Sequence, residues 1–255
     1  MYPMYPVLLK IGNFSLYSYG LMLFISFILG IKLTQKRAKK FGVKEDIIVN
    51  LAVYILIGVV IGARILYVLN HWDEFKNDLI GIIAFWRGGL GGLMFFGGFI
   101  GGFLSGLIYA KKNRLPILKM LDSISPAIAL GEGLTRIGCF LNGCCFGKPC
   151  EYGVIFPPDS PAGSTFFNIK IHPTQLYSSF FGFILFFIIL RLEKTRIIKK
   201  EGLLFSIFLF FYGLFRFLID FLRYYEDKLN FLTNQIISLS LMVIALILFL
   251  SRLKK

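Results

Sequence analysis

Seven long apolar runs constrain the fold of this chain more than any other feature. Each is close to the roughly 20 residues that a helix needs to cross the hydrocarbon core of a bilayer. An apolar content of 56% with only 16% charged residues is far from that of a soluble domain of this size. We therefore predict an all-α integral membrane protein with about seven transmembrane helices. The runs are Leu16–Leu33, Ile47–Val68, Leu93–Tyr109, Met120–Phe140, Gln175–Leu192, Leu203–Leu222 and Phe231–Leu250.

The fourth run is the weakest of the seven because it contains Asp122, Glu132 and Arg136. Six spans and one re-entrant segment therefore remain an alternative, and periodicity alone does not decide between them. The loops between the runs are short except residues 141–173, a polar stretch that is too small for a separate domain. We expect one transmembrane domain, residues 1–255.

Basic residues alternate between the two sides of the predicted bundle. Most of the 28 Lys and Arg residues follow the first, third, fifth and seventh runs, whereas the other segments mix fewer of them with Asp and Glu. Because cytoplasmic loops accumulate Lys and Arg, we predict an outer (periplasmic) N-terminus and a cytoplasmic C-terminus. The net charge of +14 then faces anionic lipid, and we expect no nucleic-acid binding. The first run lacks a preceding basic segment and a following cleavage site, which indicates a retained helix.

A glycine-rich segment, Arg87–Gly102, leads into the third run. Its four Gly-Gly pairs allow close backbone approach or a break in the helix, and plain helix packing explains them equally well. The chain shows no repeat of fixed period and no matching pair of broken helices, which weakens the interpretation as a secondary transporter without excluding it.

Three arginines lie at hydrocarbon depth, where a charged side chain costs several kcal/mol unless it has a partner or faces a polar cavity. Arg136 follows Glu132 by one helical turn and Arg216 precedes Asp220 by one turn, so structural ion pairs are one explanation. The alternative is that these guanidiniums converge on a phosphate, which their planar fork matches. Arg64 has no carboxylate nearby in sequence, which favours a ligand.

Further polar groups accompany these arginines. His172, Thr174 and Gln175 bring an imidazole, a hydroxyl and an amide to the start of the fifth run, although a histidine there is more often a local cap than a catalyst. Tyr19 and Tyr212 supply phenols at membrane depth, where an interfacial aromatic belt is the simpler interpretation.

The four cysteines, Cys139, Cys144, Cys145 and Cys150, fall within twelve residues that should face the oxidising outer side. The spacing matches no common zinc pattern, and adjacent Cys144 and Cys145 suit neither four-ligand geometry nor a mutual disulfide well. A disulfide and a metal site both stay open from the spacing, and we expect no metal.

Taken in order, these motifs resemble the prolipoprotein diacylglyceryl transferases over nearly the whole chain. One such motif would be weak evidence, whereas seven in order are specific. The matching pieces are Tyr19–Met22, Gly62–Arg64 with Tyr67, Gly88-Gly89 with Gly97-Gly98, Arg136–Gly143 through Gly147, His172–Tyr177, Tyr212–Arg216 with Asp220, and Asn234-Gln235.

The resemblance implies a multi-pass enzyme of the bacterial inner membrane. Such an enzyme moves the diacylglyceryl group of phosphatidylglycerol onto the lipobox cysteine thiol of a preprolipoprotein signal peptide, and glycerol 1-phosphate leaves. The family is similar in placing essential arginines where Arg136 and Arg216 stand, so we expect these two to bind the phosphate and stabilise the leaving group. The resemblance implies no cofactor.

Other motif positions give a second set of expected site residues. The expected catalytic residues are Arg136, Arg216 and His172, and the further substrate-binding residues are Arg64, Tyr19, Asn142, Gly147, Tyr212, Asp220 and Gln175.

This sequence departs from the family pattern in three places. Many members carry a histidine, proposed to deprotonate the thiol, where this chain has Phe96. Either His172 or a tyrosine takes that role, or the thiolate forms without a dedicated base. Better-known members have Asn and Glu in the stretch that is rich in cysteine here, and Asp220 replaces the usual glutamate. A catalytically impaired relative that binds anionic lipid or signal peptides, or a small anion transporter, are the alternative functions.

Overall fold

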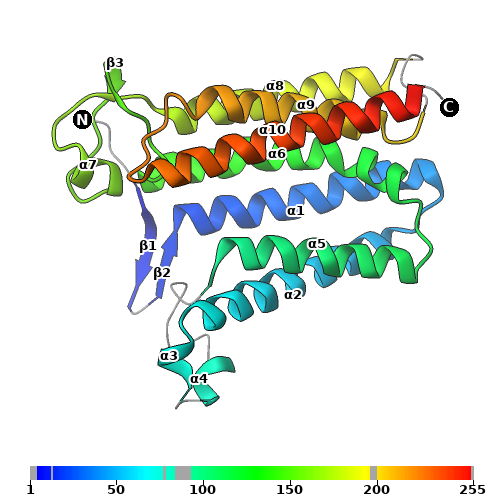
Figure 1. Cartoon of the computed structure of the whole chain (residues 1–255), viewed down its shortest axis with the longest axis horizontal. Coiled ribbons are helices and arrows are strands. Elements are labelled where there is room, and N and C mark those ends of the chain that lie inside the picture. Colours follow the sequence, from blue (N-terminus) through cyan, green and yellow to red (C-terminus); the bar gives the residue numbers. More distant parts are fainter. Residues whose placement is uncertain (1–4, 13, 77–78, 84–92, 196–199, 254–255) are drawn as a thin grey trace. The chain divides into compact units, whose positions relative to one another are not determined.

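Helices dominate the computed structural model, and each of the seven predicted apolar runs overlaps a long helix (Figure 1). The structure describes residues 5–12, 14–76, 79–83, 93–195 and 200–253. The long helices are α1 (Ser18–Ala38), α2 (Glu45–Asn70), α5 (Phe95–Lys112), α6 (Ile117–Asn142), α8 (Thr174–Glu193), α9 (Leu203–Ile219) and α10 (Lys228–Leu253). The shorter elements are β1 (Val7–Ile11), β2 (Phe14–Tyr17), η1 (Lys39–Phe41), α3 (Trp72–Phe75), α4 (Leu79–Ile83), β3 (Pro149–Val154) and α7 (Pro161–Thr165).

Four of the described helices, α1, α2, α8 and α10, are long and apolar enough to cross a membrane. Large apolar side chains project outward from these helices, as at Phe24, Phe180 and Ile247, which are each more than 60% exposed. Aliphatic and aromatic surface on this scale is suited to a lipid solvent and not to water. The chain is therefore a membrane protein.

The chain forms two compact units, one made of residues 1–34 and 118–255 and the other of residues 35–117. In the second unit, glycines bring the backbones of α2 and α5 together. A Cβ atom on Gly101 would lie 2.1 Å from the carbonyl oxygen of Gly58, and one on Gly97 would lie 2.3 Å from that of Gly62. Only residues without a side chain allow this approach. The packing interpretation of the glycines is thus confirmed for Gly97–Gly102, whereas Arg87–Gly92 lies outside the described residues.

In the first unit, α6, α8, α9 and α10 run side by side (Figure 1). Their core contains Leu185, Ile189 and Phe208. The Asp122 carboxylate of α6 accepts hydrogen bonds from the backbone nitrogens of Gly202 and Phe205, at 2.6 and 2.8 Å. The acidic residue that weakened the fourth apolar run therefore caps the N-terminus of α9, where a negative charge is favourable.

Two features outside the long helices were not predicted. β1 and β2 form an antiparallel hairpin before α1. The loop of residues 141–173 carries β3 and α7 and has its own small core of Phe156, Ala162 and Ile171. The backbone nitrogen of Ala162 donates to the carbonyl of Gly143 at 3.0 Å. This loop is therefore folded back against the end of α6, where the expected site residues begin.

Candidate functional site

Both predicted arginine–carboxylate pairs form, and both lie in the first unit. Arg136 Nε is 2.8 Å from Glu132 Oε1 within α6, and Arg216 Nη2 is 3.1 Å from Asp220 Oδ1 at the end of α9. The Asp220 side chain is 0% exposed and that of Arg216 only 12%. Because a buried charge without a partner is costly, each carboxylate stabilises its guanidinium and fixes its orientation.

Tyr212 connects the two pairs. Its phenol, on α9, interacts electrostatically with Glu132, Arg216, Arg136 and Asp220. The arginines that are 80 residues apart in the chain therefore share one neighbourhood. The phosphate hypothesis requires this proximity of the two arginines, whereas two independent ion pairs would not require it.

The Arg216 guanidinium still has an unused donor. Its Nη2 atom lies 3.5 Å from Asn234 Oδ1 on α10, in addition to its contact with Asp220. Its Nη1 atom is buried and has no hydrogen-bond partner within the described part of the chain. A buried, unsatisfied N–H group on a charged side chain costs free energy, and an anionic ligand would supply the missing acceptor.

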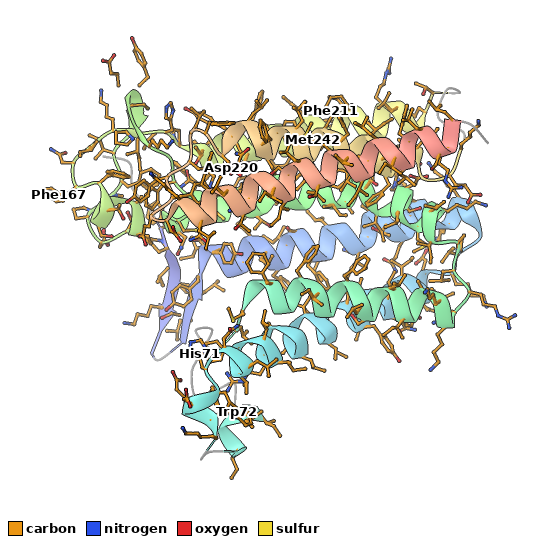
Figure 2. All side chains as sticks on the ribbon, viewed as in Figure 1. His71, Trp72, Phe167, Phe211, Asp220 and Met242 are labelled. Carbon is orange, nitrogen blue, oxygen red and sulfur yellow. The ribbon has the colours of Figure 1, made fainter. Side chains whose placement is uncertain are left out.

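Asp220 also contacts two residues beyond the end of α9 that were not among the expected site residues. Tyr225 Oη donates to Asp220 Oδ1 at 2.7 Å, and Arg223 Nη1 is 3.9 Å from the same oxygen. Figure 2 labels Asp220 at the end of α9. Burial raises the pKa of Tyr225, so its hydroxyl remains a donor at neutral pH. Arg223 Nε is another buried nitrogen without a partner among the described residues. The spacing of three residues from Asp220 was the only sequence signal for Arg223.

Gly147 brings three segments to this place. Its backbone nitrogen donates to the His172 carbonyl at 3.0 Å, and the next nitrogen, that of Lys148, donates to the Leu222 carbonyl at 2.8 Å. A Cβ atom on Gly147 would lie 2.6 Å from His172 Cβ and 2.8 Å from the Leu222 oxygen. The position thus requires glycine, and it aligns the loop of residues 141–173 with the chain just before Arg223.

The His172 ring points to a tyrosine. Its Nδ1 atom is 3.4 Å from Tyr177 Oη, and the two rings meet edge to face with their centroids 6.1 Å apart. Its backbone carbonyl accepts from Gly147. These contacts give His172 a part in joining the loop of residues 141–173 to α8, and its predicted role as a base stays a prediction.

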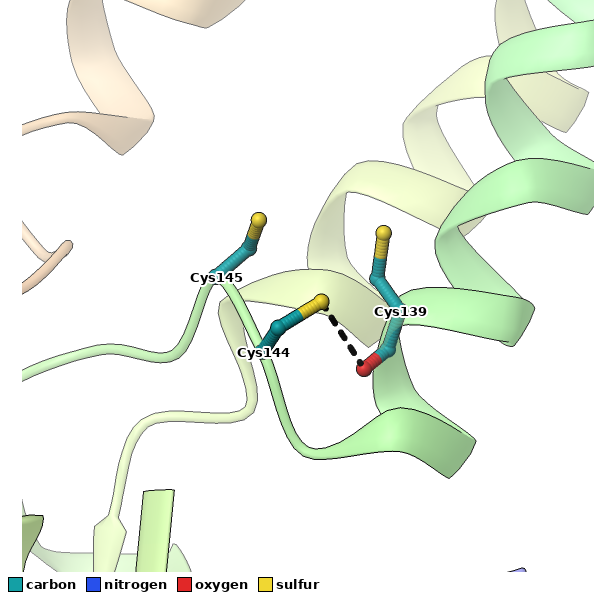
Figure 3. A group of neighbouring side chains, drawn as sticks. All are labelled: Cys139, Cys144 and Cys145. Atoms are coloured by element: carbon teal, nitrogen blue, oxygen red, sulfur yellow. Dashed lines mark hydrogen bonds between the residues drawn. The ribbon is translucent and has the colours of Figure 1, made fainter. Parts of the chain in front are cut away.

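Three of the four cysteines converge at the end of α6. The Sγ atoms of Cys139, Cys144 and Cys145 all lie within 4.8 Å of one another (Figure 3). All four cysteines are free thiols. Asn142, an expected site residue, lies within hydrogen-bonding reach of the Cys144 thiol. The cysteine spacing alone did not indicate this cluster.

The charged neighbours of the cluster are the site arginines. The neighbouring Cys139 and Cys144 thiols, together with nearby Arg223 and Arg136, lower the pKa of the Cys145 thiol. The cluster is therefore continuous with the arginine site.

Tyr19 lies beside the same end of α6 as the cysteine cluster. Its Cα atom would be 3.1 Å from a Cβ atom on Gly138, so α1 and α6 approach closely here. Its phenol interacts electrostatically with the three clustered cysteines and with Arg136. The structure therefore brings Tyr19 to the end of α6, near Arg136.

Arg64 belongs to the second unit and is held by the backbone. Its Nε atom donates to the Ile82 carbonyl at 2.9 Å and its Nη2 atom to the Gly81 carbonyl at 2.6 Å. The guanidinium also lies over the rings of Tyr67 and Phe75, at 5.5 and 5.1 Å from their centroids. Arg64 has no carboxylate nearby in the sequence, and carbonyl groups of α4 and two aromatic rings contact its guanidinium instead. A role of Arg64 in binding a ligand stays a prediction.

Known proteins match this chain over most of its length. The family model for prolipoprotein diacylglyceryl transferase matches residues 6–251. A protein of Clostridium tetani, named phosphatidylglycerol–prolipoprotein diacylglyceryl transferase, is 38% identical over 83% of this chain and 82% of its own length. Proteins of the same name from Trichormus variabilis and Nostoc sp. are each 34% identical, over 82% of this chain and 75% of their own.

The family match over residues 6–251 covers the segments that form the candidate site, from Tyr19 to Asn234. The two arginine–carboxylate pairs, the close contacts of Gly147 and the long helices therefore lie within the part of the chain that matches many named relatives. This chain belongs to the prolipoprotein diacylglyceryl transferase family.

Proposed function

We propose that this protein is a membrane transferase that moves the diacylglyceryl group of phosphatidylglycerol to the lipobox cysteine thiol of preprolipoproteins. The names of the relatives state this kind of activity for those proteins. The family match over residues 6–251 supports carrying it to this chain. Phosphatidylglycerol and the preprolipoprotein signal peptide are then its two substrates.

One structural observation carries the phosphate chemistry. The buried Arg216 guanidinium keeps one nitrogen, Nη1, without a partner in the part of the chain that the structure describes. It shares the neighbourhood of Tyr212 with Arg136. A phosphodiester offers the oxygen acceptors that such a guanidinium needs, and a greasy surround strengthens that contact.

The proposed reaction is a displacement at carbon. The substrate thiolate attacks the glyceryl carbon that bears the phosphate ester, a carbon–sulfur bond forms, and the carbon–oxygen bond breaks. The leaving group is glycerol 1-phosphate, which takes the bonding electron pair and gains a negative charge. Arg136 and Arg216 stabilise that charge, and Glu132 and Asp220 hold the guanidiniums in place as it develops.

The topology belongs to the same proposal. Seven spans, with the N-terminus outside and the C-terminus in the cytoplasm, fit the seven long helices and the alternation of basic segments. In that arrangement the loop of residues 141–173 and the end of α6 face the outer leaflet of the bacterial inner membrane. The signal peptide of an exported protein would reach the cysteine cluster from that side.

The test is a lipidation assay in cells depleted of their own transferase. Expression of this chain should add the mass of one diacylglyceryl group to a model lipoprotein. The same lipoprotein with its lipobox cysteine changed to serine should gain no mass. No gain on the cysteine form, with the protein present in the membrane, would overturn the proposed function.

A further inference from the structure

We propose that Cys139, Cys144 and Cys145 bind a zinc ion whose fourth coordination position takes the thiol of the preprolipoprotein substrate. The metal site itself stands on the geometry of the three cysteines. The identity of the fourth ligand rests on the proposed function. The cysteine spacing had left a metal site open, and this proposal replaces the expectation of no metal.

The three thiols are already close to zinc-binding geometry. Zinc–sulfur bonds of about 2.3 Å in a tetrahedral site place the sulfur atoms roughly 3.8 Å apart. In the structure all three Sγ atoms lie within 4.8 Å of one another. Figure 3 shows the three side chains directed toward a common space. Side-chain rotations that close each pair by about 1 Å or less would complete the site.

The backbone holds the adjacent cysteines in an unusual conformation. Cys145 has a φ of 60°, in the left-handed region that side chains other than glycine rarely adopt. Neighbouring side chains in an extended segment point to opposite sides, whereas here both thiols turn to the same space. Strain of this kind persists only where the surrounding structure maintains it and is concentrated at functional sites.

Contacts from α8 maintain this conformation. Thr174 Oγ1 donates to the Cys145 carbonyl at 2.9 Å, and Gln175 Nε2 donates to the Cys144 carbonyl at 2.7 Å. The Cys144 nitrogen also donates to the Cys139 carbonyl at 3.1 Å. The two adjacent cysteines are thus fixed to the end of α6 from both sides. A preformed ligand set of this kind lowers the cost of binding a metal.

The ligand set favours zinc with an open position. Thiolates are soft ligands that select zinc over hard cations. Within the described residues, no fourth His, Cys, Asp or Glu joins the group. Structural zinc sites have four protein ligands, whereas catalytic sites have three and leave the fourth position for water or substrate. Three thiolates around Zn²⁺ leave a net negative charge, which nearby Arg136 and Arg223 balance.

The metal would supply the thiolate that the reaction needs. A free thiol with a pKa of about 8.5 is mostly protonated at neutral pH, and coordination to Zn²⁺ removes its proton to solvent. The bound sulfur then forms the carbon–sulfur bond as glycerol 1-phosphate leaves, and the thioether product is released. Zinc keeps its oxidation state throughout. The chain has two histidines. The Nδ1 atom of His71 contacts the Tyr67 carbonyl oxygen and that of His172 contacts the Tyr177 hydroxyl, so the described ring contacts of both are with tyrosines.

Metal content tests the site without reference to activity. We expect the purified full-length protein in detergent to contain about one zinc per chain by elemental mass spectrometry. Cys139→Ser and Cys145→Ser should lose it. Cys150→Ser is the matched control, because Cys150 lies in β3 outside the group and should leave the zinc content unchanged. Zinc-free wild-type protein with full transfer activity, or a disulfide within the group, would overturn the proposal.

Cobalt tests the fourth position in the wild-type protein. Co²⁺ in place of zinc should give thiolate-to-cobalt absorption, and a synthetic lipobox peptide should shift it, whereas the peptide with serine for its cysteine should not. A spectrum that the cysteine peptide leaves unchanged would overturn the proposed role of the fourth position. Removal of zinc by a chelator should lower transfer by about 100-fold or more, and added Zn²⁺ should restore it.

The two proposals fail in different ways. A peptide-dependent cobalt spectrum without any lipid transfer would support the metal site and reject the proposed function. Transfer that persists at its full rate after complete removal of the metal would support the function and reject the zinc.

Discussion

At the scale of the residue, the proposed phosphate site would depend on guanidinium geometry as well as on charge. Arg136 contacts Glu132 through Nε, and within the described residues its two outer nitrogens remain for the proposed ligand. Lysine at this position would keep the positive charge but lose the planar set of donors. Substitutions that conserve charge therefore separate a phosphate-binding role from a purely electrostatic one.

We expect Arg136→Lys to lower transfer by about 100-fold or more, the usual cost of losing one donor that stabilises a developing negative charge. The rate of diacylglyceryl transfer to a lipobox peptide measures this. Arg191→Lys, the same change at the exposed end of α8, serves as the control and should keep the normal rate. Near-normal transfer by Arg136→Lys would reject its phosphate role.

His172 offers a second test at this scale. Because the proposed zinc ion would form the thiolate without a protein base, and the described contacts of His172 are to Tyr177 and Gly147, we expect His172→Gln to leave the pH dependence of transfer unchanged. The measurement is transfer rate against pH for both proteins. Loss of one limb of the profile in the variant would return the role of general base to this histidine.

Tyr225 should make stability depend on pH. Burial raises its pKa in the folded protein, so the neutral hydroxyl is favoured there. Its contribution to stability is fully present below the unfolded pKa of about 10 and is lost as the pH rises through the higher folded value. Tyr225→Phe should flatten this alkaline loss and, at neutral pH, cost about 1 kcal/mol for the lost bond to Asp220. Thermal unfolding in detergent between neutral and alkaline pH measures both effects, and an equally steep alkaline loss in the variant would contradict the assignment.

At the scale of the element, close helix contacts and caps determine the frame. Asp122 caps α9 from α6, and Thr174 and Gln175 at the start of α8 hold the loop that follows α6. Each of these links joins segments that are distant in the chain. The loss of these links should therefore disturb the arrangement of the candidate site.

The glycine contact between α2 and α5 has a direct test. Gly101→Ala should destabilise the protein by about 1–3 kcal/mol, because the new Cβ atom would overlap the Gly58 carbonyl oxygen. Gly20→Ala is the control in another helix, where a Cβ atom meets nothing within 4 Å. Thermal unfolding of the two variants in the same detergent compares them. Equal stability of the Gly101→Ala and Gly20→Ala variants would contradict the expected overlap between α5 and α2.

At the scale of the whole molecule, the topology can be tested by fusion. Because basic segments alternate along the chain, we expect a C-terminal fluorescent protein to fold in the cytoplasm and a C-terminal alkaline phosphatase to be inactive. Phosphatase inserted in the loop of residues 141–173 should be active. The reverse pattern would contradict the proposed orientation and would place the cysteine cluster on the cytoplasmic side.

Much of the fold could be read from the sequence because its signals are local. Apolar run length predicted all seven long helices, and one-turn spacing predicted the pairs of Arg136 with Glu132 and of Arg216 with Asp220. The family motifs identified the same arginines. The N-terminal hairpin was missed because β2 runs directly into the first apolar helix and carries no separate pattern.

The rest depended on tertiary structure. Adjacent cysteines that should point apart converge on Cys139 because Cys145 adopts a left-handed conformation held by α8. Arg223 joins the site because Gly147 lets the loop of residues 141–173 cross the end of α9. Composition and spacing describe the chain along its own length, and they fix which segments leave water for lipid. Which side chains meet depends on how distant segments fold back on one another. Here that is decided only when the loop of residues 141–173 packs against α8 and the end of α9.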